Sequence, residues 1–473
     1  MNDRTGFLDG VYDFTRSNFR TLKARWRDLA GASRSLVPSA LVGDATERLR
    51  EQMQDCLEGR GGEVSARARA AALGQTYLAL PTAGRERFLR LLASEFDIDR
   101  VAVAALCQRL SHARGDDEKR RIERSLRQAL EPPRVRLLTQ FNALPSGVKF
   151  LVDMRAELMN FARDDETLGA LDLDLHGLLA NWFDEGFLEI KRITWESPAT
   201  LLEKLMAYEA VHEIRSWTDL KNRLEADRRC FAYFHPRMPD EPLIFVEVAL
   251  VQGMADNVQS LLDETAPVGD PAAADTAIFY SISNCQRGLN GISFGAFLIK
   301  RVVDRLAAEL PHLARYATLS PMPGFRAWLD ARLVEEGEDL LTPIERRALD
   351  ALPGQANERG IEALLARPHW YEDDVVAQAL KTPLLRLAAR YLLNEKTSRG
   401  RALDGVAHFH LSNGARVERL NWLGDLSPKG LQQSAGIMIN YLYRLSDIEE
   451  NHEAYTGEGR VMASPAIMRL LKT

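Results

Sequence analysis

Two short stretches of the chain contain side chains that could take part in proton transfer. Ser320 lies in Leu319-Ser-Pro-Met-Pro-Gly-Phe325, a loop in which two prolines restrict the backbone. His408 and His410 lie in Val406-Ala-His-Phe-His-Leu411 and, on a strand, would share one face. Two histidines at this spacing could also be metal ligands, but we find no third histidine or carboxylate at a spacing that completes a metal site.

Each stretch also has an ordinary structural explanation. A Ser-Pro pair is common in turns and helix caps, and a histidine pair on a strand can be exposed or simply hydrogen-bonded. From the residues alone, these explanations stay open for Ser320 and for the two histidines. The pair Asn413-Gly414 predicts a tight turn, so that 406–411 and 416–421 would form a hairpin.

A third stretch could hold a phosphate group. Residues 277–283 form an apolar strand, a loop with Gly288 and Gly291 follows, and Ile292–Leu310 has the spacing of a helix with one apolar face. A loop leading into a helix start offers unpaired N–H groups and the positive end of the helix dipole, which favours a pyrophosphate. The glycines match neither of the common phosphate-binding motifs, so a structural turn also stays open.

The elements that position these stretches divide the chain into two parts. Residues 1–188 have apolar residues at helical spacing in the segments 66–80, 85–96, 101–112, 117–130, 141–164 and 173–183. After residue 188, strands are predicted over 188–195, 230–235, 243–251, 277–283, 406–411 and 416–421, with a last long helix over 431–445. Residues of about 325–400 are helical and look inserted. The prediction is an α+β protein, with an all-helical domain 1–188 followed by a mixed α/β domain 189–473.

Composition limits the classes of function. The 473 residues are 46% hydrophobic and 27% charged, enough for two or three ordinary domains. The net charge of -6 disfavours a nucleic-acid partner, and four well-separated cysteines give no zinc or disulfide pattern. No apolar run reaches the roughly 20 residues of a membrane span, and the first residues lack the apolar core of a signal peptide. We therefore expect a cytoplasmic protein with no membrane association.

These stretches resemble segments of the malonyl-CoA decarboxylase family. The resemblance rests on "FYSISNCQRGLNGISFGAFLIKRVV", on Leu-Ser-Pro-x-Pro-Gly-Phe around Ser320, and on "HFHLSNGARVERLNW". It covers nearly all of the last 285 or so residues and implies a GNAT-like catalytic domain. One departure is Ser293, where some members of the family have an acidic residue.

The resemblance also assigns roles to residues. It implies that Ser320 and His410 are catalytic. Tyr443, in a stretch that resembles the family's last helix, is a candidate for orienting His410, and Arg419 is a weaker candidate for a structural ion pair near the site; core packing or surface pairing stays open for both. His408 falls where the family's pattern varies. The residues implied to bind the CoA part of the substrate, besides Ser320 and His410, are Asn290, Gly291, Ile292, Ser293, Phe294, Gly295 and Ala296.

The activity implied is the conversion of malonyl-CoA to acetyl-CoA and CO2. The Ser/His pair would stabilise and protonate the thioester enolate, and the residues leave open which of the two delivers the proton. No metal or other cofactor is expected, because the thioester carbonyl accepts the electrons. The family also implies a homo-oligomer, a dimer or tetramer formed through the helical domain.

Two alternatives stay open. One is a GNAT-type N-acyltransferase, which would move an acyl group from CoA to an amine and would need a general base near an amine channel. The other is a non-catalytic CoA-binding scaffold.

Overall fold

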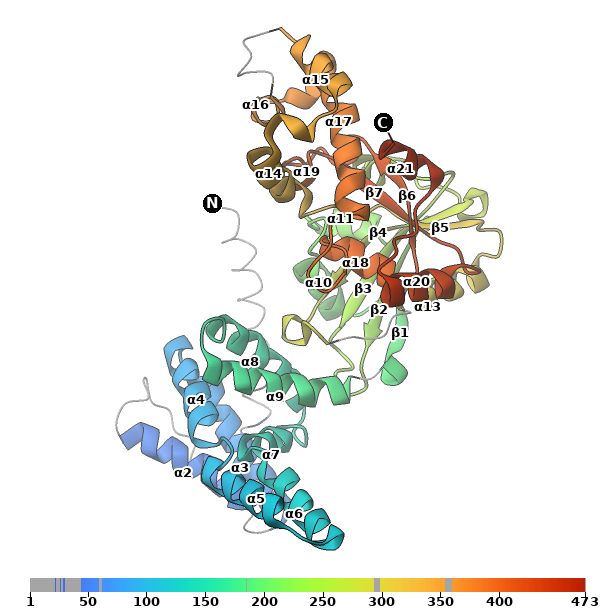
Figure 1. The fold of residues 1–473 in the computed structure, drawn as a ribbon. Helices are drawn as coiled ribbons and strands as arrows, with labels where there is room; N and C mark the ends of the chain where they lie inside the picture. Colours follow the sequence, from blue (N-terminus) through green and yellow to red (C-terminus); the bar gives the residue numbers. More distant parts are fainter. Residues whose placement is uncertain are drawn as a thin grey trace. The chain divides into compact units, whose positions relative to one another are not determined.

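The computed structural model describes residues 22, 26, 29, 44–58, 62–183, 185–292, 298–353 and 360–472. The chain splits into two compact units, drawn in Figure 1. Unit 1 contains residues 1–189 and two short segments from later in the chain, Phe234–Leu243 and Asn284–Phe294. Unit 2 contains residues 190–233, 244–283 and 295–473. The predicted α+β organisation, helical first and mixed afterwards, is confirmed.

Unit 1 is built from helices. Those described are α2 (Asp44–Glu58), α3 (Glu63–Ala79), α4 (Thr82–Glu95), α5 (Arg100–His112), α6 (Asp116–Ala129), α7 (Pro133–Phe141), α8 (Gly147–Phe161), α9 (Glu166–Trp182) and the short 3-10 helices η1 (Glu185–Phe187) and η3 (Arg287–Leu289).

Local sequence explains where these helices begin. Asp99 accepts hydrogen bonds from two backbone N–H groups at the start of α5, and Asp165 does the same for α9. Pro133 stands in the first turn of α7, where its missing N–H costs nothing. The core is aromatic: the rings of Trp26, Tyr77, Phe88, Phe141 and Phe150, all fully buried, contact one another.

Unit 2 contains a seven-stranded sheet in the order β1-β2-β3-β4-β5-β7-β6. The strands are β1 (Glu189–Ile193), β2 (Arg228–Phe234), β3 (Ile244–Val251), β4 (Thr276–Asn284), β5 (Arg315–Thr318), β6 (Arg416–Asn421) and β7 (Met438–Tyr443). The predicted hairpin over 230–235 and 243–251 is confirmed as antiparallel β2 and β3. The predicted strands at 188–195, 277–283 and 416–421 are confirmed as β1, β4 and β6.

The centre of the sheet separates two environments. β4 and β5 are parallel, with Thr276 opposite Arg315 and Phe279 opposite Thr318, while β7 is antiparallel to both β5 and β6. One face carries an apolar core to which Ile278, Ala317 and other buried residues contribute. Because side chains alternate along a strand, Phe279, Thr318 and their cross-strand neighbours on β7 lie on the other face.

Helices cover this sheet and form the predicted helical region within 325–400 (Figure 1). They are α10 (Ala199–Tyr208), α11 (Trp217–Asn222), α12 (Val258–Leu261), α13 (Leu298–Glu309), α14 (Phe325–Glu336), α15 (Pro343–Asp350), α16 (Ile361–Leu365), α17 (Asp374–Leu393), α18 (Gly405–Ser412), α19 (Pro428–Ser434), α20 (Ile448–Glu458) and α21 (Pro465–Leu470), with the 3-10 helices η2 (Pro271–Ala273), η4 (Gly337–Leu340) and η6 (Trp370–Glu372).

The predicted strand over 406–411 is wrong, because this segment is the helix α18. Asp404 starts the helix, since its carboxylate accepts hydrogen bonds from the Val406 and Ala407 N–H groups. Gly414, with φ of 80°, ends it. The Ala415 N–H donates to the His410 carbonyl and the Gly414 N–H to the Leu411 carbonyl, which is a Schellman motif. Asn413-Gly414 is therefore a helix end and not a hairpin turn.

The predicted helix over 431–445 is also wrong. It is divided into α19 and β7, and two consecutive left-handed residues, Ala435 and Gly436, separate them. Every residue of β7 is buried, including Asn440, so apolar and polar residues do not alternate along the strand, and its period does not distinguish it from a buried helix. The helix expected from Ile292 is described from Leu298 onward, and Ile292 itself is not helical.

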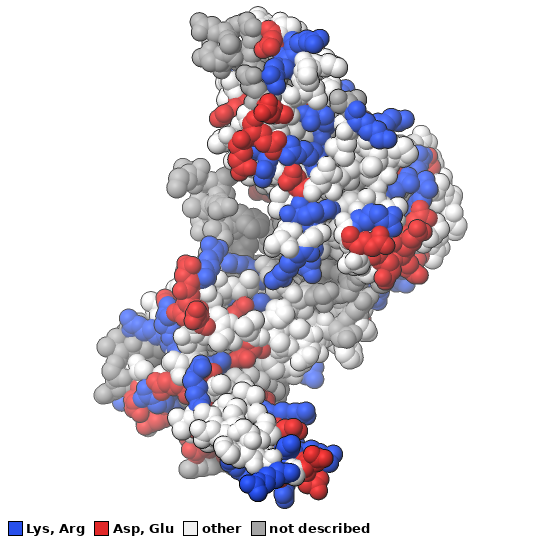
Figure 2. All heavy atoms as spheres, viewed as in Figure 1, with Lys and Arg blue, Asp and Glu red and all other residues white. Residues whose placement is uncertain are grey.

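The surface view shows positive and negative side chains mixed over the visible face (Figure 2). Among the described residues, no helix has the length and apolar character needed to cross a membrane.

Replacing Gly414 with alanine should destabilise the protein. The new Cβ would lie 2.2 Å from the Ile448 carbonyl oxygen, at a backbone conformation that L residues avoid. We expect the free energy of unfolding in urea to fall by about 2 kcal/mol or more. Gly405→Ala in the same helix is the control: nothing lies within 4 Å of its Cβ, so stability should stay equal or rise slightly. Equal effects of the two changes would contradict a specific need for glycine at position 414.

Candidate active site

Ser320 lies just beyond the end of β5. Its N–H donates to the Ile439 carbonyl at 2.8 Å, and the Ile439 N–H donates back to the Ser320 carbonyl at 2.9 Å. The last β4–β5 hydrogen bond in the described register runs from the Leu319 N–H to the Phe279 carbonyl. Ser320 therefore continues the antiparallel pairing of β5 with β7, one residue beyond the last hydrogen bond to β4. The side chain is buried on the same face of the sheet as Thr318.

The structure brings Ser320, His410 and Tyr443 together. The His410 Nε2 atom lies 3.0 Å from the Ser320 Oγ, and its Nδ1 lies 2.8 Å from the Tyr443 hydroxyl oxygen. The Ser320 Oγ is also 2.9 Å from the Thr318 Oγ1, and the His410 ring stacks on Tyr441 with centroids 4.6 Å apart. A hydroxyl, an imidazole and a phenol thus form one continuous hydrogen-bonded chain.

A single carboxylate joins the two segments that carry this pair. Asp404 caps α18, the helix of His410, through one oxygen. Its other oxygen accepts hydrogen bonds from the Gly324 N–H and the Tyr391 hydroxyl, both at 3.3 Å. Gly324 belongs to the proline-containing loop that begins at Ser320. Asp404 therefore fixes the serine loop against the histidine helix.

Burial sets the charge state of the imidazole. His410 is 2% exposed, and this burial lowers its pKa to about 3, so the ring is neutral at pH 7. Burial also raises the pKa of Tyr443 well above its usual value, which keeps the phenol neutral. A neutral imidazole has one donor and one acceptor nitrogen. The hydrogen bonds between Ser320, His410 and Tyr443 can therefore run in either direction. Ser320 either donates its hydroxyl proton to His410 or accepts a hydrogen bond from it.

His408 belongs to a different environment, so the predicted shared face of the two histidines is wrong. Its Nδ1 lies 2.8 Å from the Tyr455 hydroxyl. Residues two apart point to nearly opposite sides of a helix, whereas they share a face of a strand. Arg419, expected near an ion pair, instead donates to the Asn440 side chain and to backbone carbonyls of Met254 and Ala255.

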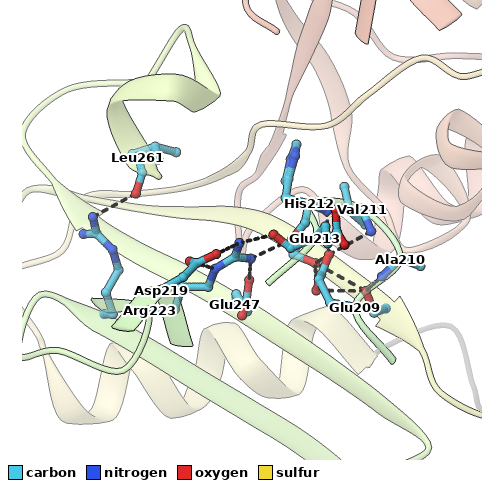
Figure 3. Close-up of polar contacts among 12 residues, drawn as sticks. Glu209, Ala210, Val211, His212, Glu213, Asp219, Arg223, Glu247 and Leu261 are labelled. Atoms are coloured by element: carbon cyan, nitrogen blue, oxygen red, sulfur yellow. Dashed lines mark hydrogen bonds and ion pairs between the residues drawn. The ribbon is translucent and has the colours of Figure 1, made fainter. Parts of the chain in front are cut away.

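A second polar cluster, which the sequence did not reveal, fixes the loop 209–213 (Figure 3). The buried Glu209 carboxylate accepts hydrogen bonds from the hydroxyls of Ser281 and Ser283 on β4 and from the N–H groups of Val211 and His212. Ser281 and Ser283 share the sheet face of Phe279, as Ser320's neighbour Thr318 does. The only signal in the sequence is one acidic residue after a helix, which predicts nothing specific.

The other side of this loop is bound by Arg223. Its guanidinium donates to the carbonyls of His212 and Glu213 and forms ion pairs with Asp219 and Glu247 (Figure 3). Burial raises the pKa of Glu247, and the positive charge of Arg223 opposes this shift. Charged side chains thus satisfy the backbone of a segment that has no regular structure.

The proposed nucleotide-binding loop is described only in part. Asn290, Gly291 and Ile292 belong to unit 1, and Gly291 has φ of 82°, a conformation that suits glycine. Ser293, Phe294, Gly295 and Ala296 lie outside the described residues.

Comparison with known proteins decides the family. Residues 186–473 match the malonyl-CoA decarboxylase C-terminal domain, and residues 96–183 match the N-terminal domain of the same family. The chain belongs to the malonyl-CoA decarboxylase family. It is therefore an enzyme of the carboxy-lyase class.

Named relatives agree with this membership of the malonyl-CoA decarboxylases. The mitochondrial malonyl-CoA decarboxylase of Anser anser anser is 37% identical over 85% of this chain and 83% of its own. The crystal structure of malonyl-CoA decarboxylase from Rhodopseudomonas palustris has a TM-score of 0.82 and 42% identity, covering 89% of this chain and 99% of its own. That from Agrobacterium vitis has a TM-score of 0.79 and 42% identity, covering 90% and 99%.

The buried His410 predicts a pH dependence of stability for this decarboxylase. Below pH 6.5 the unfolded state takes up a proton on this histidine, whereas the folded state does not until about pH 3. Stability therefore falls as the pH drops from 6.5 toward 3. Between pH 7 and pH 5, the free energy of unfolding should fall by about 2 kcal/mol more in the wild type than in His410→Asn. Parallel urea titrations of both proteins measure this difference, and parallel pH curves would show that His410 titrates normally in the folded protein.

Proposed function

We propose that this protein converts malonyl-CoA to acetyl-CoA and CO2, with Ser320 and His410 acting on the malonyl group. One observation carries the proposal: a buried serine hydroxyl and a neutral imidazole lie 3.0 Å apart in a member of the malonyl-CoA decarboxylase family. The two residues are 90 positions apart in the sequence, so only the fold brings them together.

The reaction needs a hydrogen-bond donor and a proton donor near the malonyl group. The bond between the α-carbon and the carboxylate breaks, CO2 leaves, and the electron pair remains on the α-carbon and the thioester oxygen as an enolate. A hydrogen-bond donor near that oxygen stabilises the developing charge, and a proton donor near the α-carbon completes acetyl-CoA. The proton that is consumed returns from solvent.

The hydrogen-bonded chain can supply both functions. In one arrangement the Tyr443 hydroxyl donates to the His410 Nδ1, and the Nε2–H donates toward Ser320. In the other arrangement the serine donates to Nε2 and the imidazole donates to the phenol. One of Ser320 and His410 then contacts the thioester oxygen while the other delivers the proton, and both assignments balance the reaction.

The CoA part of the substrate is proposed to bind residues 290–296 in a GNAT-like fold. The sheet order and the parallel β4–β5 pair support this fold. The β4–β5 register ends at Phe279 and Thr318, and Ser320 pairs with β7 beyond it. This divergence leaves the end of β4 unpaired on that side in the described register, as a GNAT-like CoA site requires.

Assembly and location stay predictions. Homo-oligomerisation through the helical domain is supported by α5, which buries none of its residues within the chain and leaves Val101 81% exposed. The expected cytoplasmic location stays a prediction as well; the relatives from Anser anser anser and Rattus norvegicus are named mitochondrial.

The proposed reaction is tested with malonyl-CoA and no acceptor. CO2 and acetyl-CoA should form in equal amounts, and Ser320→Ala or His410→Asn should each lower kcat by about a hundredfold or more. Binding of CoA to both variants, measured by calorimetry, controls for folding. Turnover that requires an added amine would favour an acyltransferase, and CoA binding without turnover in the wild type would favour a scaffold.

A matched pair of tyrosine variants tests the hydrogen-bonded chain. Tyr443→Phe removes the hydroxyl that contacts His410, so kcat should fall by about tenfold while KM changes by less than about twofold. Tyr441→Phe keeps the ring that stacks on His410 and removes a buried hydroxyl without a hydrogen-bond partner among the described residues, so kcat should stay within about twofold. Equal losses in the two variants would remove Tyr443 from the mechanism.

A further inference from the structure

The segment that follows β4 packs within the helical unit. Residues 284–292 belong to unit 1, and η3 lies against α8. Gly288 makes the closest approach: a Cβ at this position would lie 1.8 Å from the Val152 carbonyl oxygen. Only glycine allows the two backbones to come this near.

Arg155 of α8 holds this segment by its backbone. The side chain is 4% exposed, and its Nε and Nη2 atoms donate to Asp172 of α9. Its Nη1 donates to the carbonyls of Gly288 and Asn290, at 2.7 and 2.9 Å. His176, also on α9, places its Nε2 atom 3.2 Å from the Gly291 carbonyl oxygen. The Asp172 carboxylate thus orients the Arg155 guanidinium, and the guanidinium holds the loop by its carbonyl groups.

The direction of these carbonyls has a consequence for the N–H groups. In a trans peptide the C=O and the following N–H point in opposite directions. Because the Asn290 carbonyl points to Arg155, the Gly291 N–H points away from it. This N–H has no hydrogen-bond partner among the described residues. An unpaired N–H beside a left-handed glycine is the kind of group that binds a phosphate oxygen.

We propose that Arg155 is a positioning residue for nucleotide binding, which sets the loop 288–291 so that the Gly291 N–H meets the pyrophosphate of CoA. The proposal rests on the proposed function and adds a positioning role for a residue outside the catalytic pair. Arg155 touches neither the thioester nor the catalytic pair in this scheme. Its loss should therefore weaken recognition of the nucleotide half of the substrate and leave the acyl half unaffected.

Two thioester substrates distinguish recognition of the nucleotide half from recognition of the acyl half. We compare malonyl-CoA with S-malonylpantetheine, which lacks the nucleotide and its phosphates. In Arg155→Met, kcat/KM for malonyl-CoA should fall by about ten- to a hundredfold, mainly through KM, because hydrogen bonds from a charged donor are lost. For S-malonylpantetheine, kcat/KM should stay within about twofold of the wild-type value.

Arg134→Met is the matched control. Arg134 is equally buried, pairs with Asp174 on the same helix α9 and donates to the Ala93 carbonyl, but its contacts lie elsewhere in unit 1. In this variant, kcat/KM for each of the two thioesters should stay close to the wild-type value. It therefore separates the loss of a buried arginine from the loss of the loop contact.

The outcomes are distinct. An equal fall with both thioesters in Arg155→Met, or no change with malonyl-CoA, would overturn the proposal. If Arg155→Met does not fold, His176→Ala and Asp172→Asn provide milder changes and should show the same selective loss. If the wild type releases CO2 from neither thioester, the proposed function fails. Calorimetry with CoA then tests the role of Arg155 by itself. Weaker CoA binding in Arg155→Met than in Arg134→Met supports this role, and equal binding refutes it.

Discussion

The geometry of the candidate site depends on the Asp404 carboxylate. One oxygen caps the helix that carries His410, and the other binds the Gly324 N–H in the loop that begins at Ser320. Burial raises the pKa of this acid, although its backbone hydrogen bonds act in the opposite direction. A buried carboxylate is tolerated only when hydrogen bonds satisfy it, and here backbone N–H groups and Tyr391 do so. The same bonds that make the acid acceptable place the two catalytic candidates together.

The strand β7 provides the other half of this geometry. It lies between β5 and β6, and every residue in it is buried. Ile439 pairs with Ser320 through the backbone, while Tyr441 and Tyr443 contact the His410 ring and its Nδ1 atom. Beyond the last hydrogen bond to β4, the chain at Ser320 stays paired with β7. The position of the hydroxyl and the orientation of the imidazole thus both depend on one buried strand.

The resemblance to a known family singled out residues that lie together, whereas the local structure around them was partly mispredicted. The residue types alone leave ordinary structural explanations open for Ser320 and His410, and only the resemblance assigns roles to them and to Tyr443; the structure places the three side chains in contact. The strands β1 to β4 were predicted from β-branched and aromatic runs bounded by turn residues, which are local signals.

Two local errors have physical causes. Asn-Gly suits left-handed backbone conformations, and both a hairpin turn and a helix end require them, so the pair at 413–414 does not distinguish the two. The Asp404 cap before the segment favoured the helix, and weighing it would have corrected the prediction. For β7 no local signal was present, because complete burial removes the alternation by which strands are recognised.

The contacts that escaped prediction altogether share one property: a buried charged side chain binds backbone groups. Arg155 donates to carbonyls of the loop 288–290. In the loop 209–213, Arg223 donates to the carbonyls of His212 and Glu213, and Glu209 accepts a hydrogen bond from the His212 N–H. Irregular segments leave their peptide groups unpaired, and burying them without partners would cost free energy. Because the partners are peptide groups, which every residue has, no complementary residue type marks the contact in the sequence. The fork of an arginine reaches two carbonyls at fixed angles, whereas a lysine offers a single point charge, so even a change that keeps the charge would alter the loops.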